Sequence, residues 1–480
     1  MSVQSVSSAR PLSAATGRSL VLAFSATLFL SAFLLFSVQP LFTRMILPKL
    51  GGSPAVWSVA MVFFQGVLLL GYGYAHFLTR RFGPVKGAGL HLAVMLIAVI
   101  ALPIAVAPGW ARPPETGQAF WLLGAFGASV GLPFFAVSAN GPLLQAWFAR
   151  SGHPHASDPY FLYGASNIGS LLALLSYPVL VEPQLTLSAQ SAGWAVGYGL
   201  LVAAIAGVAL MAQKNAKSAE TVVEAESPAK PVTWRQRLGW TGLAFVPSAL
   251  LVAVTAHLST DVAAAPFLWV LPLSLFLLTF VITFQRRPII DHSWMLGLQP
   301  LVAGGALSVL ALGYALSLEF FFVLDLAVLF VVAMVCHGEL VRRRPHADDL
   351  TGFYLWMSFG GVLGGIFSGL IAPQVFSTVL EYPLLVAASF LARPAVFASG
   401  GWRKAGLAAA VTAIVALAAL SVVRAGGVED KANLVLLQVV QIVLIAALLI
   451  SHRSPKRLAA VAVTFLAMAV FVAPVAKTET

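Results

Sequence analysis

Charged residues and cysteine are scarce in this sequence. Only 9% of its 480 residues are Asp, Glu, Lys or Arg, and 59% are hydrophobic. A soluble globular domain carries roughly 25% charged residues, so water cannot be the main solvent of this chain. The single cysteine, Cys336, lies inside an apolar run, which excludes a disulfide framework and a thiolate metal site.

The sequence also lacks the motifs of soluble enzymes. No Gly-rich phosphate loop follows a strand, no metal-ligand spacing is present, and no Ser-His-Asp arrangement is evident. We therefore expect no catalytic residues, no metal and no cofactor in this chain. Of the possible functions, a membrane-embedded enzyme has the least support.

Long apolar runs are abundant instead. Each is long enough to cross a hydrocarbon core of ~30 Å as a helix, so we predict an all-α polytopic membrane protein with about fourteen transmembrane helices. Two sets of six are followed by two or three more. The predicted spans lie at 19–41, 55–78, 87–108, 118–147, 159–181, 190–212, 240–258, 265–284, 294–315, 319–341, 351–374, 376–392, 404–423, 433–451 and 457–474.

These runs divide the chain into five segments. The stretch from Lys214 to Arg237 is rich in Ala, Lys, Glu, Ser and Pro, too polar to span a membrane and too poor in bulky residues to fold alone. The predicted segments are a cytoplasmic tail at 1–18, a six-helix bundle at 19–212, a flexible cytoplasmic linker at 213–239, a second six-helix bundle at 240–395, and additional transmembrane helices at 396–480.

The formal net charge of +11 comes from short basic clusters between apolar runs. Because Lys and Arg accumulate in cytoplasmic loops, this pattern reports orientation and not a nucleic-acid partner. With the N-terminus inside, the inside segments hold most of these clusters, such as Arg80-Arg81, Arg342-Arg343-Arg344 and Arg393 with Arg403-Lys404. We therefore predict a cytoplasmic N-terminus.

The two halves contain similar strings in the same order. The offset between the matched spans is six helices, an even number, which predicts two parallel repeats of the kind found in the major facilitator superfamily. The alternative is chance similarity among helices of shared composition. The matched strings are 140–143 with 337–340, 160–163 with 353–356, and 169–178 with 364–373.

Ionisable residues at membrane depth are candidates for function, because each one is costly there. His257 and Asp261 lie four residues apart on one helix face and are able to share a proton or bind a cation, or else both touch water at a helix end. Asp325 is the most deeply placed carboxylate, with a structural hydrogen bond as the alternative. His337 and Glu339 suit a gate salt bridge or a proton relay, unless they form a solvated cytoplasmic helix end.

Neutral polar residues of the first half are candidates for lining a solute path. They are Gln39, Gln65, Asn140 and Asn167. Such groups also hold helices together, with contributions of about 0.6–2 kcal/mol each. A glycine series from Gly360 to Gly369 favours close helix contact over phosphate binding.

Six strings carry a family resemblance that covers most of residues 20–395. They are SVQP at 37–40, LPKLGGSPAVW at 47–57, QGVLLLGYGYAH at 65–76, HLSTDVAAAPFLWVLP at 257–272, CHGEL at 336–340 and FYLW at 353–356. In these strings the chain resembles the membrane region of bacterial fused transporter/spermidine-synthase proteins. The resemblance implies a major-facilitator-like membrane unit in the bacterial inner membrane.

Members of that family carry a soluble aminopropyltransferase-like domain after the last helix. This sequence ends at Thr480, just past an apolar run, with no room for a Rossmann-like fold. We therefore expect any such chemistry to belong to a separate polypeptide.

Two functions follow from these expectations. The first is a transporter that moves a small cationic metabolite, such as a polyamine, across the lipid bilayer by alternating access. The second is a membrane scaffold that does not transport, and whose cytoplasmic basic loops dock a separately encoded aminopropyltransferase-like enzyme.

Overall fold

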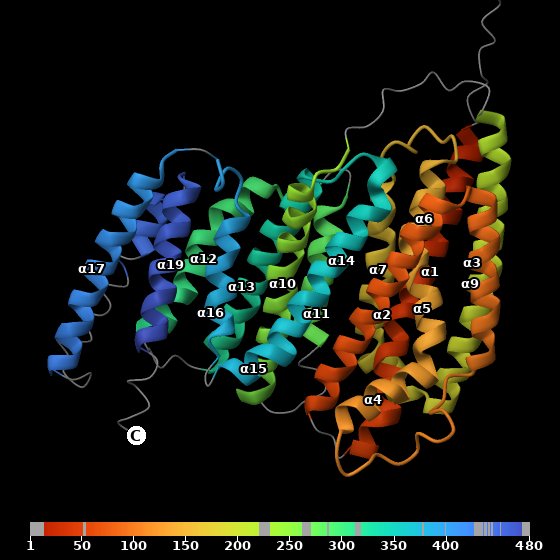
Figure 1. Ribbon diagram of the computed structural model, residues 1–480, viewed down its shortest axis with the longest axis horizontal. Coiled ribbons are helices and arrows are strands. Elements are labelled where there is room, and N and C mark those ends of the chain that lie inside the picture. The colour runs from red at the N-terminus through yellow and green to blue at the C-terminus, as the bar shows by residue number, and fades with distance from the viewer. Residues whose placement is uncertain are drawn as a thin grey trace, which may run out of the picture. The chain divides into compact units, whose positions relative to one another are not determined.

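In the computed structural model, every regular element among the described residues is a helix, which confirms the predicted all-α class (Figure 1). Helices are the expected answer to a lipid environment, because each backbone amide finds its partner within its own segment. The described residues are 14–50, 54–219, 231–261, 270–285, 288–312, 318–376, 379–398, 400–426, 435, 439, 442, 445–451 and 453–472.

The chain divides into two compact units. One comprises Met1–Thr241, Phe280–Arg287 and Arg343–Val362, and the other comprises Gly242–Thr279, Pro288–Arg342 and Leu363–Thr480. The elements before the unit boundary in α10 are α1 (Ala14–Ile46), η1 (Leu47–Leu50), α2 (Pro54–Arg81), α3 (Pro84–Ala98), η2 (Val99–Ala101), α4 (Gln118–Phe126), η3 (Gly127–Gly131), α5 (Leu132–Ser138), α6 (Asn140–Ala149), η4 (Pro159–Phe161), α7 (Leu162–Ser176), η5 (Tyr177–Val181), α8 (Glu182–Gln184) and α9 (Leu187–Ala219).

The elements from α10 onward comprise the helices of the second half and the helices of the C-terminal region. They are α10 (Trp234–Asp261), α11 (Val270–Thr283), α12 (His292–Leu312), α13 (Leu318–Arg342), η6 (Ala347–Asp349), α14 (Leu350–Ile366), η7 (Phe367–Ile371), α15 (Ala372–Val375), α16 (Glu381–Ser389), η8 (Phe390–Ala392), α17 (Trp402–Gly426) and α19 (Pro455–Val472).

Membrane spans fall where the apolar runs predict them. In the described part of the chain, nine helical runs are long and apolar enough to cross a bilayer, and each overlaps one predicted span. Apolar helices α11, α12 and α16 occupy three further predicted spans, and α17 and α19 occupy two of the C-terminal ones. The predicted span at 433–451 lies largely outside the described residues.

Large apolar side chains point outward from these spans as well as inward. Ile100 is 85% exposed and Phe120 is 82% exposed, whereas Phe24, Phe42 and Phe126 are fully buried between helices. Outward-facing apolar groups are expected when lipid tails, and not water, surround the helices.

Three of the spans contain a wider π-helical turn. A proline removes a backbone donor and crowds the carbonyl four residues earlier, and a local π turn accommodates both effects. Each π segment includes a proline or ends two residues before one. The pairs are η3 with Pro133, η5 with Pro178, and η7 with Pro373.

One glycine in each half allows the backbones of two helices of that half to lie close together. A Cβ placed on Gly169 of α7 would lie 2.4 Å from the carbonyl oxygen of Phe29 in α1. A Cβ on Gly364 of α14 would lie 2.7 Å from the carbonyl oxygen of Phe245 in α10. Gly169 and Gly364 are matched positions of the internal repeat, so the packing agrees with a duplication and confirms close contact at Gly364.

The predicted linker at 213–239 is too long at both ends. Helix α9 continues to Ala219, and α10 begins at Trp234 and not at 240. A capping box starts α10, because the Thr233 amide donates to Oε1 of Gln236 at 2.8 Å and the Gln236 amide donates to Oγ1 of Thr233 at 3.4 Å. Residues 220–230 lie outside the described part of the chain.

We expect Gly169→Ala and Gly364→Ala each to destabilise the fold by about 1–3 kcal/mol, because the added methyl group has to push two helix backbones apart. This expected loss is the net value after the ~1 kcal/mol that alanine gains over glycine in a helix. The measurement is the free energy of unfolding in mixed micelles. Gly199→Ala in α9 and Gly242→Ala in α10 are matched controls, because a Cβ there meets nothing within 4 Å. Equal stability in all four variants would contradict the close-packing interpretation.

Candidate functional site

A histidine–carboxylate pair joins α10 to α13 inside the second unit. Nδ1 of His257 donates to Oδ2 of Asp325 at 2.8 Å. The side chain of Asp325 is 5% exposed and that of His257 is 26% exposed, so the imidazole forms the accessible side of the pair. The hydrogen bond predicted as the structural alternative for Asp325 is therefore present, and the same contact suits proton sharing.

Two side chains at the start of α16 complete this cluster. The Tyr382 ring lies 6.4 Å from the His257 ring, and its hydroxyl approaches Asp325 without meeting strict hydrogen-bond geometry. Glu381 lies near enough to His257 for their charges to interact. Neither Glu381 nor Tyr382 was predicted as a candidate, because acidic and aromatic side chains are common at the start of a membrane span.

The predicted partnership of His257 with Asp261 is not tested. Asp261 is the last residue of α10, and its side chain lies outside the described residues. The described partner of His257 is on another helix, α13, and not one turn further along its own.

A second histidine–carboxylate pair joins α12 to α13. Nε2 of His292 donates to Oε1 of Glu339 at 2.9 Å, and the Arg342 guanidinium lies 3.5 Å from the same oxygen. Glu339 is 2% exposed, so the expectation of a solvated helix end is wrong for this residue. Gly338 makes the pair possible, because a Cβ there would lie 2.2 Å from the His292 ring.

His337 faces a different neighbour. It is fully buried, its ring packs edge-on against Phe276 at 5.1 Å, and its Nδ1 lies 2.8 Å from Oγ1 of Thr279. Because the Thr279 hydroxyl donates its proton to the carbonyl of Phe276 at 2.6 Å, its oxygen acts as the acceptor for His337 Nδ1. His337 thus ties α13 to α11, and it too is not solvated.

The two carboxylates of α13 do not share one site. Asp325 and Glu339 are separated by about 21 Å of helix rise, at 1.5 Å for each residue. Each is paired with a histidine from a different helix. His257 with Asp325, and His292 with Glu339, therefore form two separate histidine–carboxylate pairs at two depths of α13.

In the first unit, Asn140 connects three helices. Its Oδ1 accepts a hydrogen bond from Nε2 of His91 in α3 at 2.7 Å, and its Nδ2 donates to Oγ of Ser31 in α1 at 3.0 Å. His91 and Asn140 are at most 1% exposed. His91 was not predicted as a candidate, because a single histidine in an apolar run forms no recognisable motif.

Two of the other neutral candidates of the first half form hydrogen bonds within their own helices. Nε2 of Gln39 donates to the Leu35 carbonyl at 3.2 Å, and Nδ2 of Asn167 donates to the Tyr163 carbonyl at 2.8 Å, both within their own helices. Gln65 differs, because its buried Oε1 has no hydrogen-bond partner among the described residues. The predicted solute path is not tested by these contacts.

No cluster of three or more His, Cys, Asp or Glu residues in the described ranges is arranged to hold a metal ion. Arg393, which the sequence analysis assigned to a basic cytoplasmic loop, is 6% exposed and donates to the Leu296 carbonyl at 2.7 Å and to Gln299 at 2.9 Å. The positive charge of Arg393 therefore takes part in packing against α12.

Comparison with protein-family models gave no match, and comparison with curated proteins gave none either. Solved structures do match. The chain is similar to a proton:xylose symporter of the major facilitator superfamily bound to 6-bromo-6-deoxy-D-glucose, with 13% identity, a TM-score of 0.51, and coverage of 78% of this chain and 95% of that one.

Two other transporter structures are about equally similar. A human organic anion transporter has 15% identity, a TM-score of 0.50, and coverage of 78% and 99%. A bacterial homologue of the iron transporter ferroportin, in the outward-facing state, has 14% identity, a TM-score of 0.50, and coverage of 78% and 96%. The chain is a multi-pass membrane protein with a major-facilitator-like fold. At such low identity the likeness shows the fold alone.

We expect His292→Ala to destabilise the protein by about 1–3 kcal/mol, because it removes a partner from the buried carboxylate of Glu339. In a Glu339→Gln background the same substitution should cost less, and a double-mutant cycle in mixed micelles measures the difference. His346→Ala is the matched control, because its partner Asp348 is 75% exposed and surface pairs contribute little. Equal costs of His292→Ala in both backgrounds would show that the pair is not coupled.

Proposed function

We propose that this chain is a membrane transporter of a small solute, and that His257 and Asp325 handle the proton or cation that accompanies transport. The observation that carries the proposal is a buried, hydrogen-bonded histidine–carboxylate pair between membrane helices of a major-facilitator-like fold. Ionisable groups at this depth are rare and expensive, and in membrane proteins they often mark ion and proton pathways.

The net charge of the His257–Asp325 pair suggests how the pair would couple a proton to a cation. With Asp325 ionised and His257 neutral, the pair carries one negative charge in a medium that disfavours net charge. Uptake of one proton neutralises it, and so does the approach of one cation. Proton and cation would then compete for the pair, which favours the exchange of one for the other.

Access to the pair is uneven. Asp325 is shielded, whereas His257 is partly exposed and lies near Glu381. A proton arriving from the accessible side would meet His257 first and reach Asp325 through the existing hydrogen bond. The Tyr382 hydroxyl lies beside the Asp325 carboxyl group. It would be able to form a hydrogen bond with that group when Asp325 changes its protonation state.

For the solute we propose a small organic cation of the polyamine kind. The support is the resemblance in the strings at 37–76 and 257–272, together with the carboxylates Asp325 and Glu381 near His257 in the second unit. Structures with this fold include transporters of a sugar, of organic anions and of iron, so the fold does not choose among solutes.

The scaffold for a separate aminopropyltransferase-like enzyme is the second candidate. The observation that favours it is the exposure of basic side chains at the end of α13, where the last residue, Arg342, is 58% exposed. Recovery of such an enzyme with the intact chain, in vesicles that show no solute flux, would favour this candidate over transport.

The test of transport is flux into proteoliposomes under an imposed pH gradient, with labelled putrescine and spermidine beside xylose and an organic anion. We expect Asp325→Asn to lower cation flux by about tenfold or more, which corresponds to at least ~1.4 kcal/mol, because the exchangeable charge is lost. His257→Gln should have a similar effect, since it removes the accessible proton carrier.

Asp291→Asn provides the matched control. Asp291 is an exposed carboxylate before α12 that accepts a hydrogen bond from the Ser293 amide at 2.8 Å, and asparagine is able to replace it there. Its flux should equal that of the wild type. If no solute enters the vesicles, or if all three variants carry solute at the wild-type rate, the proposal is wrong.

A further inference from the structure

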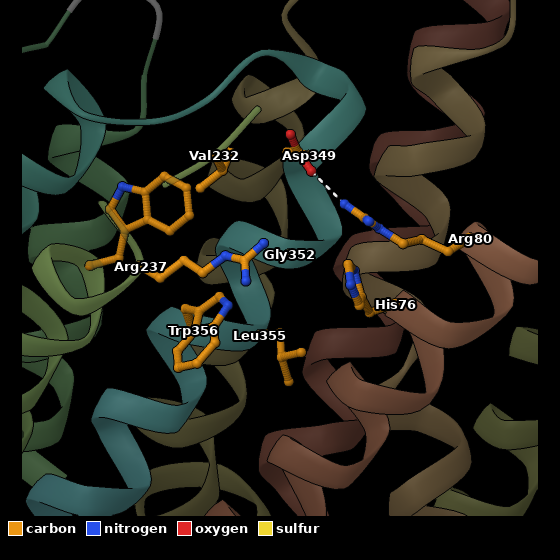
Figure 2. A pocket seen from close by; sticks show the side chains of 9 residues that line it. His76, Arg80, Val232, Arg237, Asp349, Gly352, Leu355 and Trp356 are labelled. Atoms are coloured by element: carbon orange, nitrogen blue, oxygen red, sulfur yellow. Dashed lines mark hydrogen bonds and ion pairs between the residues drawn. The ribbon is translucent and has the colours of Figure 1, made fainter. Parts of the chain in front are cut away.

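A pocket in the first unit lies at the ends of three membrane helices. It has a volume of about 190 Å³ and is lined by residues from the end of α2, the start of α10, and the η6–α14 segment (Figure 2). Those ends coincide with the ends of the candidate spans Val59–Arg81, Trp234–Leu258 and Ala347–Val375. The pocket is therefore placed at a boundary between lipid and water.

The charges around this pocket do not cancel. Arg80 is paired with Asp349, with NH2 of the former 2.7 Å from Oδ1 of the latter. Arg237 contacts aromatic rings instead, with its guanidinium carbon 4.9 Å from the centroid of Trp234 and 6.0 Å from that of Trp356. No carboxylate among the described residues pairs with Arg237. Two guanidinium groups and one carboxylate leave one positive charge in excess.

Several contacts hold Arg237 in place. The capping box of Thr233 and Gln236 starts the turn that carries it. One turn later, Nε1 of Trp240 donates to the Arg343 carbonyl at 2.9 Å, and Trp240 lines the pocket wall. A guanidinium that stacks on aromatic rings keeps its N–H edge available for an oxyanion. In Figure 2 the Arg237 guanidinium lies on one side of the pocket, with the joined Arg80 and Asp349 on the other.

We infer that this pocket binds a phosphate group, with Arg237 as its principal ligand. The excess positive charge favours an anion, and the fork of N–H groups on arginine matches the oxygens of phosphate. The volume of about 190 Å³ is below the ~300–1,000 Å³ of sites for drug-sized ligands and has room for a phosphate group. At this boundary the phosphate comes either from a lipid headgroup or from a small phosphorylated solute. The inference does not rest on the proposed transport function.

Calorimetric titration of the full-length chain with inorganic phosphate, in lipid-free detergent and with chloride lowered to keep ionic strength constant, tests the site. We expect Arg237→Gln to weaken phosphate binding by about tenfold or more, because it removes the unpaired charge. Asp349→Asn should strengthen it, because Arg80 then loses its competing partner. Arg235→Gln, in the same turn but outside the pocket, is the matched control and should leave binding unchanged.

Native mass spectrometry of the chain from phosphatidylglycerol nanodiscs distinguishes the two sources. Retained lipid that is lost in Arg237→Gln but kept in Arg235→Gln would identify a lipid headgroup as the ligand. Binding of inorganic phosphate with the same dependence would identify a soluble source. If the wild type binds neither, or if both arginine variants lose binding equally, the site does not exist.

Discussion

Inside a bilayer no water is available to satisfy a carboxylate, and this constraint decides how the two buried acidic groups of α13 are paired. Asp325 and Glu339 lie on one helix, α13. Asp325 is hydrogen-bonded to a histidine of α10, and Glu339 is hydrogen-bonded to a histidine of α12. The same contacts that make the carboxylates tolerable also join α13 to both helices. Removing either histidine would therefore affect packing as well as chemistry, since buried acids depend on their partners.

Much of the fold could be predicted from the sequence, because apolar length is a strong signal in membrane proteins. The spans lie where the runs predicted them, and Gly169 and Gly364, matched only by order in the sequence, each contact the backbone of an earlier helix of their own half. The linker was misjudged for a local reason. Thr233 and Gln236 begin a helix, although the segment around them is polar. Their Thr-x-x-Gln spacing was visible in the sequence.

The candidate site could be predicted only in part. Asp325 and His257 were both identified, but not as partners, since a contact between α10 and α13 depends on how helices pack. His91 and His292 were missed because a single histidine in an apolar run carries no pattern of its own. Arg393 was misplaced for the opposite reason: a basic residue near a helix end normally indicates a loop, yet here it bonds to α12. Sequence identifies costly groups, whereas packing decides which of them meet.

The π-helical turns have a consequence for how these spans are drawn. A π turn adds one residue to the helix without adding a turn, so everything that follows is rotated out of phase with what came before. A helical wheel drawn through 159–184 or 347–375 as one continuous α-helix would therefore assign the wrong faces beyond Tyr177–Val181 or Phe367–Ile371. Glu182, which follows directly, would be drawn about 100° away from its actual direction, because one residue covers about 100° of an α-helix. Each half of such a span needs its own wheel.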